Sequence, residues 1–197
     1  DLVMYFKDLN AFAISQKNSL RMVEANTGKV LWETNRLSGS IGRGAFDSKT
    51  GDLVLMNFKP TALGQLFSGF KNQLMRFNGK TGEVKWETSY SGTLQKKILS
   101  REILADLRIE DDKILLRMSG LQVFDFESGK FLWGASCEEV LDEVRPPVRG
   151  KILKKGIYGA ISEPLYDGDY VYILANVEGF ATNDRRKTIS KYDVKTG

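Results

Sequence analysis

The sequence predicts an all-β fold, a β-propeller built from four-stranded antiparallel blades. The main observation is a motif of an Asp-type residue, a Thr-Gly or Ser-Gly pair and a tryptophan, first seen at Glu24–Trp32. Its Thr-Gly or Ser-Gly pairs start at Thr27, Thr81, Ser128 and Thr196. A unit that recurs every roughly 40–50 residues, with insertions, is typical of repeat architectures. Short alternating segments and turn residues fill the intervals, and no segment keeps a helical period for more than two turns. Serial four-stranded units of this kind are typical of propeller blades.

The second repeat shows how one blade is read from the residues. Gly44–Asp47 leads into a turn, and the apolar segment Gly51–Phe58 and the alternating segment Gln73–Phe77 are both strand-like. Asn and Gly in the segment 78–82 accept the positive φ angles that hairpin turns need. Glu83–Thr88 then alternates again, with Val84 and Trp86 on one face.

The other repeats are read in the same way. In the third repeat, the predicted strands are Leu104–Ile109, Lys113–Met118, Leu121–Phe126 and Lys130–Gly134. In the fourth repeat, they are Gly159–Leu165, Tyr170–Ala175 and Thr188–Tyr192. The first repeat is predicted to begin inside its second strand, at Asp1–Phe6.

These repeats divide the chain into blades of approximately residues 1–34, 35–90, 91–136 and 137–197, which form a single domain fragment. This amounts to about three and a half blades, whereas closed propellers have roughly four to eight. We expect the chain to be part of a propeller of seven or eight blades. Because unpaired sheet edges promote association, the remaining blades are expected from further chain or from another copy.

The motif resembles that of the pyrroloquinoline-quinone-type propellers, the quinoprotein alcohol dehydrogenase-like superfamily, which reads Ala-x-Asp-x-x-Thr-Gly-Lys-x-x-Trp. The Asp position of the motif is occupied by Glu24, Asn78, Asp125 and Asp193. The Ala position differs from the motif in all four copies, where it is occupied by Met22, Arg76, Val123 and Lys191. The resemblance covers nearly the whole chain. It implies a propeller fold and an exported, periplasmic or lumenal setting.

The recurring glycines and tryptophans of the motif are predicted to be structural. The glycine permits the turn, and the tryptophan is a large apolar ring on the last strand that packs against a neighbouring blade, where its burial contributes about 2–3 kcal/mol. The residues of this docking motif are Gly28, Trp32, Gly82, Trp86, Gly129, Trp133 and Gly197.

The predicted working surface is the side of the blades with the longer connections, which we call the long-loop face. In a four-stranded meander, alternate connections lie at opposite ends, and long loops on a rigid scaffold usually carry binding. The long-loop face is predicted to comprise Lys7–Lys17, Lys59–Asn72, Ser89–Ser100, Ala135–Ile157 and Asn176–Lys187. The candidate partner-binding residues are Phe67, Phe70, Phe180, Arg145, Arg149, Lys154, Arg185 and Arg186.

The composition argues against several kinds of catalytic and metal site. The chain has no histidine, which removes His-based catalysis and His-ligated metals, and Cys137 is its one cysteine. The glycines of Gly39–Gly44 do not precede a helical pattern, so a nucleotide loop is not supported. Asp47–Asp52 lacks the alternating oxygen ligands of a calcium loop. We therefore predict no catalytic residue, no metal ligand and no cofactor in this segment.

The predicted function is a non-catalytic propeller scaffold that binds protein partners through the long-loop face, within a larger exported or envelope-associated assembly. The first alternative is part of a quinoprotein dehydrogenase, which would use pyrroloquinoline quinone and calcium. The second is a propeller that binds carbohydrate or another small ligand. The net charge of +4 is mild and the basic residues are not interspersed with aromatic ones, which does not favour nucleic-acid binding. No apolar run reaches the roughly 18 residues of a membrane span.

Overall fold

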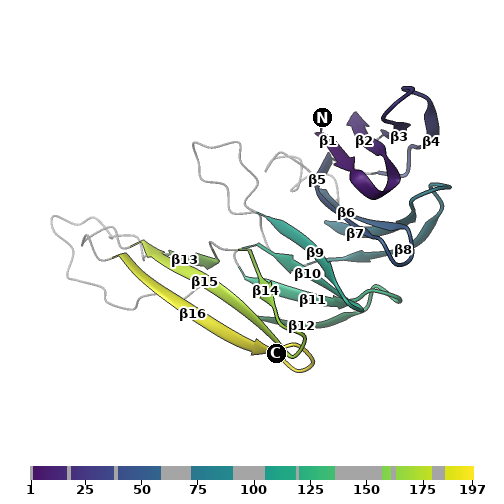
Figure 1. Cartoon of the computed structure of the whole chain (residues 1–197). Helices are drawn as coiled ribbons and strands as arrows, with labels where there is room; N and C mark the ends of the chain where they lie inside the picture. The colour runs from purple at the N-terminus through teal and green to yellow at the C-terminus, as the bar shows by residue number, and fades with distance from the viewer. Residues whose placement is uncertain are drawn as a thin grey trace, which may run out of the picture. The chain divides into compact units, whose positions relative to one another are not determined.

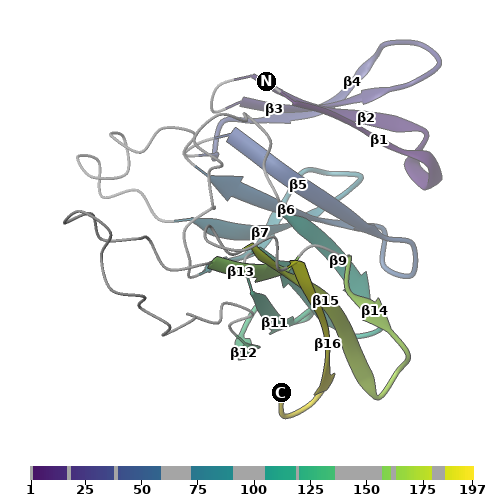
Figure 2. The same cartoon turned by 90° about the vertical axis from the view of Figure 1, so that its left-hand side faces the viewer.

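The computed structural model describes residues 2–16, 19–37, 40–58, 72–90, 105–118, 120–135, 157–160, 163–178 and 185–197. These residues form the strands β1 to β16 and one 3-10 turn, η1 (Lys7–Leu9), and no α-helix occurs among them. The strands are arranged in four sheets of four strands each (Figures 1 and 2). The predicted all-β fold of four-stranded antiparallel blades is confirmed.

The first sheet has the order β1-β2-β3-β4 and contains β1 (Leu2–Phe6), β2 (Ala11–Gln16), β3 (Ser19–Glu24) and β4 (Val30–Thr34). The prediction that Asp1–Phe6 is a second strand was wrong, because β1 is the first of four strands here. The predicted loop 7–17 contains β2, in which alternate residues are buried. The small side chains of Ala11 and Ala13 concealed this alternation in the sequence.

The second sheet has the order β5-β6-β7-β8 and contains β5 (Ser40–Asp47), β6 (Asp52–Phe58), β7 (Gln73–Asn78) and β8 (Val84–Ser89). It reproduces the predicted strands and turns. The register between β7 and β8 shifts between Arg76 and Phe77, and the register between β3 and β4 shifts at the corresponding place. In both sheets the motif tryptophan lies opposite the residue at the Ala place, as Trp32 faces Met22 and Trp86 faces Arg76.

The third sheet has the order β12-β11-β10-β9 and contains β9 (Asp106–Glu110), β10 (Lys113–Arg117), β11 (Leu121–Asp125) and β12 (Phe131–Ala135). These bounds agree with the predicted strands to within two residues. The turn between β9 and β10 is made by Asp111 and Asp112, and Asp111 has the positive φ of 52° that a tight hairpin turn requires.

The fourth sheet contains β13 (Ile157–Ala160), β14 (Leu165–Tyr166), β15 (Tyr170–Glu178) and β16 (Arg185–Asp193). β13 and β14 both pair with β15, so the predicted strand Gly159–Leu165 is interrupted rather than continuous. Pro164 precedes β14 and has no amide hydrogen to donate to β15, which is a physical reason for the interruption. The longest pairing is β15 with β16 (Figure 1).

The chain divides into two compact units. The first comprises Asp1–Ser91, Leu107–Ile114 and Asp125–Phe131, and the second comprises Gly92–Asp106, Leu115–Phe124 and Leu132–Gly197. The core of the first unit is formed by apolar residues of the first two sheets, among them Leu20, Leu55 and Phe77, which are fully buried. In the second unit, a smaller cluster is formed around Trp133, with Val123 and Val171.

Candidate functional site

The predicted partner-binding residues fall into two groups. Phe67, Phe70, Arg145, Arg149, Lys154 and Phe180 lie outside the described residues. Arg185 and Arg186 begin β16, where their backbones pair with Glu178 and Val177 of β15. The predicted loop 176–187 is therefore wrong at both ends, and residues 179–184 connect the two strands. The alternation of apolar residues along β15 continues past Asn176, and its pairing with β16 outweighs the turn preference of asparagine.

The connections are unequal at the two ends of the sheets. Strands are joined at one end by short turns, such as residues 48–51, 79–83, 111–112 and 126–130. The connections 59–72, 90–105, 136–156 and 179–184 are longer, and nearly all of their residues lie outside the described part of the chain. With residues 7–17 and the two ends of 176–187 assigned to strands, these four segments are what remains of the predicted long-loop face.

Four equivalent turns carry the motif glycines, and we call them the glycine turns. They are Glu24–Gly28, Asn78–Gly82, Asp125–Gly129 and Asp193–Gly197. In each, the glycine amide donates to the carbonyl of the first residue of the turn, over 2.8 to 2.9 Å. Each of these glycines has a φ between 70° and 85°, a region that other L residues adopt at a cost.

Three of the glycine turns contact a tryptophan from the preceding sheet in the sequence. A Cβ atom at Gly82 would lie 2.6 Å from the ring of Trp32, and one at Gly129 would lie 2.7 Å from the ring of Trp86. At Gly197 the corresponding distance to Trp133 is 3.0 Å. Glycine is therefore needed at the first two positions for two reasons, the backbone angle and the close approach of an indole ring.

The indole nitrogens add a second link to the same turns. Nε1 of Trp32 donates to the carbonyl of Gly79 over 2.8 Å, Nε1 of Trp86 to Phe126 over 3.0 Å, and Nε1 of Trp133 to Val194 over 2.9 Å. Each acceptor is the second residue of its glycine turn. The ring of Trp32 also stacks on Phe77, with the ring centroids 6.2 Å apart. These contacts join strands that lie far apart in the sequence.

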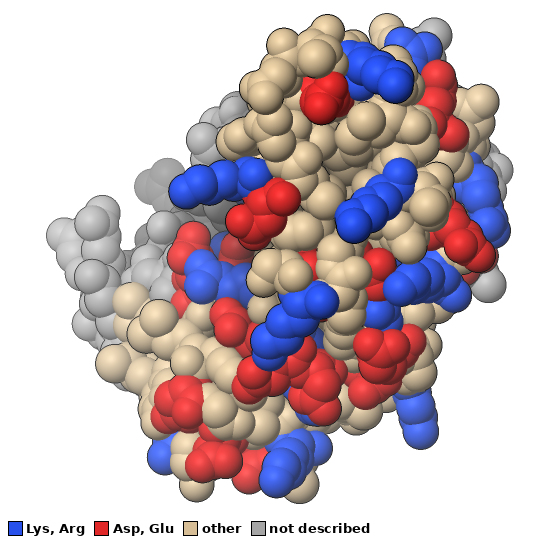
Figure 3. Space-filling model, turned by 45° about the vertical axis from the view of Figure 1, so that its right-hand side comes forward, with Lys and Arg blue, Asp and Glu red and all other residues tan. Residues whose placement is uncertain are grey.

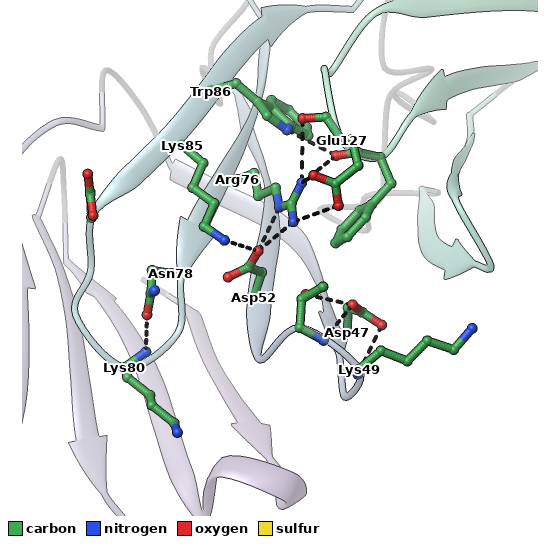
Figure 4. Close-up of polar contacts among 12 residues, drawn as sticks. Asp47, Lys49, Asp52, Arg76, Asn78, Lys80, Lys85, Trp86 and Glu127 are labelled. Atoms are coloured by element: carbon green, nitrogen blue, oxygen red, sulfur yellow. Dashed lines mark hydrogen bonds and ion pairs between the residues drawn. The ribbon is translucent and has the colours of Figure 1, made fainter.

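A buried ionic network lies beside the contact of Trp86 (Figure 4). Arg76 is 2% exposed and Asp52 is 1% exposed, and the guanidinium donates to Oδ2 of Asp52 at 2.7 to 2.8 Å. On its other side, Arg76 pairs with Glu127 over 3.0 Å and donates to the carbonyl of Phe126 over 2.9 Å. Lys85 reaches Oδ2 of Asp52 from the opposite side, at 2.7 Å. The network thus joins the second sheet to the glycine turn Asp125–Gly129.

The charges in this network are matched. Burial alone lowers the pKa of the Arg76 guanidinium, but hydrogen bonds and opposite charge from Glu127 and Asp52 outweigh burial and raise that pKa above its ordinary value. The guanidinium also lies over the ring of Phe126, with Cζ 3.9 Å from the ring centroid. Sequence reasoning missed this network. The signal available in the sequence was Arg76 itself, which stands at the position where the family motif has alanine.

Carboxylates and amides at the start of the glycine turns accept hydrogen bonds from the turn amides. Oδ1 of Asp125 accepts from the Ser128 amide at 2.7 Å, and Oδ1 of Asn78 accepts from the Lys80 amide at 2.9 Å. Hydrogen bonds from Ser128 lower the pKa of Asp125, because they favour the ionised carboxylate. Backbone hydrogen bonds from Lys195 and Thr196 lower the pKa of Asp193 in the same way.

Asp125 can be protonated and Asn78 cannot, so the two turns are predicted to contribute differently to the pH dependence of stability. A carboxyl group with a lowered pKa in the folded state stabilises the fold above its unfolded pKa, near 3.8, and loses that contribution as the pH falls through its folded pKa. We expect Asp125→Asn to reduce the loss of stability between pH 5 and acidic pH, and Asn78→Asp to increase it. Urea unfolding at a series of pH values measures both. Parallel pH profiles for the two variants and the parent would contradict this explanation.

No metal centre is formed by the part of the chain that the structure describes, since no group of three or more His, Cys, Asp or Glu side chains there is arranged to hold an ion. Cys137 lies outside that part. Residues 40–44 of the glycine-rich segment belong to β5, which is a strand and not a nucleotide-binding loop before a helix. Asp47 caps its own turn by accepting hydrogen bonds from Thr50, whose hydroxyl lies 2.6 Å away.

The described surface carries both charges. On the face drawn in Figure 3, basic and acidic side chains are interspersed rather than gathered by sign. Two exposed ion pairs join side chains of opposite charge, Arg21–Glu33 at 3.0 Å and Lys49–Asp111 at 3.4 Å. Within the described residues, no helix has the length and apolar character needed to cross a membrane.

Comparison with known families gives one match to a sequence profile. The profile of the family described as "Outer membrane protein assembly factor BamB" matches residues 16–153. A search of curated proteins gives no match.

Solved structures with a similar fold include quinohemoprotein alcohol dehydrogenase ADHIIG from Pseudomonas putida HK5, with a TM-score of 0.57 and 13% identity over 95% of this chain and 31% of that one. The Pan2 WD40 domain from Neurospora crassa has a TM-score of 0.53 and 10% identity, over 98% of this chain and 48% of that one. BamB from Moraxella catarrhalis has a TM-score of 0.49 and 11% identity, over 99% of this chain and 65% of that one. The chain therefore spans less than two thirds of each of these proteins, and the first two likenesses show a propeller fold.

Proposed function

Because the chain belongs to the family described as outer membrane protein assembly factor BamB, we propose that it is a non-catalytic β-propeller scaffold that binds other proteins. The resemblance of its repeats to pyrroloquinoline-quinone-type propellers is confirmed by the same match and by the fold shared with a quinohemoprotein alcohol dehydrogenase. The observation that carries the proposal is the family match over residues 16–153, which includes most of the first three sheets.

The setting proposed for this scaffold is an exported or envelope-associated assembly, in the periplasm. The support is the description of the matched family, whose members are named for the assembly of outer membrane proteins. Partners of such a scaffold are proteins, and the interspersed surface charge in Figure 3 is not the continuous basic patch that nucleic acid favours.

The partner surface in this proposal is the long-loop face. The indole contacts and the Arg76 network hold neighbouring strands in the first unit, and rigid strands of this kind present loops in a defined arrangement. Aromatic and arginine side chains are enriched at the energetic centres of protein interfaces. The proposed contact residues are accordingly Phe67, Phe70, Phe180, Arg145, Arg149 and Lys154 of these connections, together with Arg185 and Arg186, which follow the connection 179–184 at the start of β16.

Co-purification from the native envelope tests this proposal with matched variants. Charge reversal at Arg185 and Arg186, or Phe67→Ala with Phe70→Ala, is expected to weaken partner recovery by about tenfold or more, as loss of interface anchors does. The control is charge reversal at Lys80 and Lys195, two exposed lysines in glycine turns at the opposite end of their sheets. Equal partner recovery with all three variants, each with unchanged thermal unfolding, would rule out the long-loop face.

The same preparation separates the scaffold from the quinoprotein alternative. An enzyme of that class would take up pyrroloquinoline quinone and calcium stoichiometrically and would oxidise an alcohol or sugar in a dye-coupled assay. The proposed scaffold would do neither. Uptake of the cofactor with turnover would replace the scaffold proposal by an enzymatic one.

A further inference from the structure

Asn78 and Gly79 form the one Asn-Gly pair in the chain. Asparagine before glycine is the pair most prone to deamidation, because glycine has no side chain to hinder its amide nitrogen and allows the backbone angles of ring closure. In that reaction the glycine nitrogen bonds to Cγ of asparagine, and ammonia leaves to give a cyclic imide. Water then opens the imide to aspartate or isoaspartate, so one water is consumed and nothing is oxidised or reduced.

The fold requires glycine at position 79. A Cβ atom there would lie 2.4 Å from the carbonyl oxygen of Gly51, which is a backbone atom and not the movable end of a side chain. The other three glycine turns begin with Glu24, Asp125 and Asp193, which have no side-chain amide to lose. The packing on Gly51 therefore keeps glycine after the only asparagine that begins a glycine turn.

Hydrogen bonds hold both reactive groups of this pair in the folded turn. The amide of Gly79, which is buried, donates to the carbonyl of Gly51 over 3.0 Å. Oδ1 of Asn78 accepts from the amides of Lys80 and Thr81, at 2.9 and 3.1 Å (Figure 4 shows the first). Imide formation requires the Gly79 nitrogen to lose its proton and the Asn78 side chain to turn toward it. These bonds oppose both changes, so Asn78 is protected as long as the turn is closed.

The contact with the first sheet helps to keep the turn closed. Nε1 of Trp32 donates to the carbonyl of Gly79 over 2.8 Å, and this tryptophan is 8% exposed. We propose that Asn78 is a site of spontaneous deamidation that reacts only when the turn Asn78–Gly82 opens, at a frequency limited by the hydrogen bond from Trp32.

The two products differ in what they do to the turn. Aspartate at position 78 keeps the main chain and the side-chain acceptor of the turn amides. Isoaspartate adds one methylene group to the main chain and moves the carbonyl that accepts from the Gly82 amide, over 2.8 Å, out of its position. Formation of isoaspartate therefore loosens the link between the first two sheets.

Peptide mass spectrometry of the full-length protein tests the site without any substitution. In mildly alkaline buffer, deamidation of Asn78 is expected to be at least about tenfold slower in the native protein than in urea, because the Gly79 nitrogen becomes accessible only in the open state. Equal rates in the two conditions, or no deamidation of Asn78 in urea, would overturn the proposal.

Trp32→Phe tests the role of the indole, because it keeps an apolar ring and removes the donor to Gly79. It is expected to speed native deamidation of Asn78 by about fivefold, the effect of one ordinary hydrogen bond on the opening equilibrium, with no change of the rate in urea. The control is Leu31→Ala, at the exposed neighbour of Trp32 on β4, which is expected to leave the native rate unchanged. A native rate for Trp32→Phe no higher than that for Leu31→Ala would contradict the proposal.

The product claim has its own comparison. Molecules that contain isoaspartate at position 78, isolated after partial deamidation, are expected to unfold at a lower temperature than Asn78→Asp, which represents the aspartate product. The same thermal midpoint for both would show that the altered main chain does not disturb the turn, and would refute this consequence of the modification.

Discussion

Arg76→Ala is expected to lower the free energy of unfolding of the first unit by about 3–5 kcal/mol, the cost of leaving a buried charge without its partner. The guanidinium is 2% exposed, and its removal would leave Oδ2 of Asp52 with Lys85 alone. The pairing with Glu127 contributes little of this, because that carboxylate is 72% exposed and is screened by water. Urea unfolding followed by circular dichroism measures the change.

Two comparisons separate the effect of burying the charged pair on stability from the effect of losing an arginine as such. Arg21→Ala breaks an exposed pair with Glu33, at 3.0 Å, and is expected to cost about 0–1 kcal/mol. The double variant Arg76→Met with Asp52→Ala copies Met22 and Ala11, which occupy the same register positions in the first sheet. It is expected to be more stable than Arg76→Ala, since no buried charge is left unpaired. If Arg76→Ala costs no more than Arg21→Ala, the network does not stabilise the fold.

Trp32→Ala has the second large expected effect, a loss of about 3–5 kcal/mol in the free energy of unfolding. The ring is 8% exposed, packs on Gly82 and stacks on Phe77, so its removal leaves a cavity between the first two sheets. Trp32→Phe keeps most of the apolar ring but removes the donor to the carbonyl of Gly79, and is expected to cost about 1 kcal/mol from that bond, plus a smaller packing loss.

Leu31 provides the control for Trp32, because it is the preceding residue on β4 and is 43% exposed. Leu31→Ala is expected to change stability by less than about 1 kcal/mol, as surface substitutions do. Chemical unfolding of the three variants under one set of conditions ranks them. A cost for Trp32→Ala as small as that for Leu31→Ala would show that the indole contact does not hold the two sheets together.

Errors in the sequence prediction have local physical causes. The sequence predicts a loop in place of β2 because Asn10 is a turn residue and the buried positions of β2 are two alanines and a serine, which carry a weak apolar signal. The sequence also predicts a loop from Asn176, at the end of β15. In the structure Asn176 pairs with Lys187, which belongs to a strand that follows later in the chain. In both places, a neighbouring strand overrides the preference of single residues.

The Arg76 network illustrates what sequence patterns do not contain. Arg76 is separated from Asp52 by 24 residues and from Glu127 by 51 residues, and the three belong to different repeats or different strands. In the sequence, each reads as an ordinary charged residue near a turn. Their meeting depends on the register of β6 with β7 and on the glycine turn at Asp125, which places Glu127 beside the guanidinium.

The sequence by itself determined the all-β class, the repeat and the residues that repeat, since alternation, positive-φ turns and recurring tryptophans are local patterns. The contacts of those residues came from tertiary packing. The contact of Trp32 with Gly82 and the position of Arg76 between Asp52 and Glu127 depend on how separate strands approach one another. Such contacts follow from the packing of segments distant in the chain, which a local pattern does not encode.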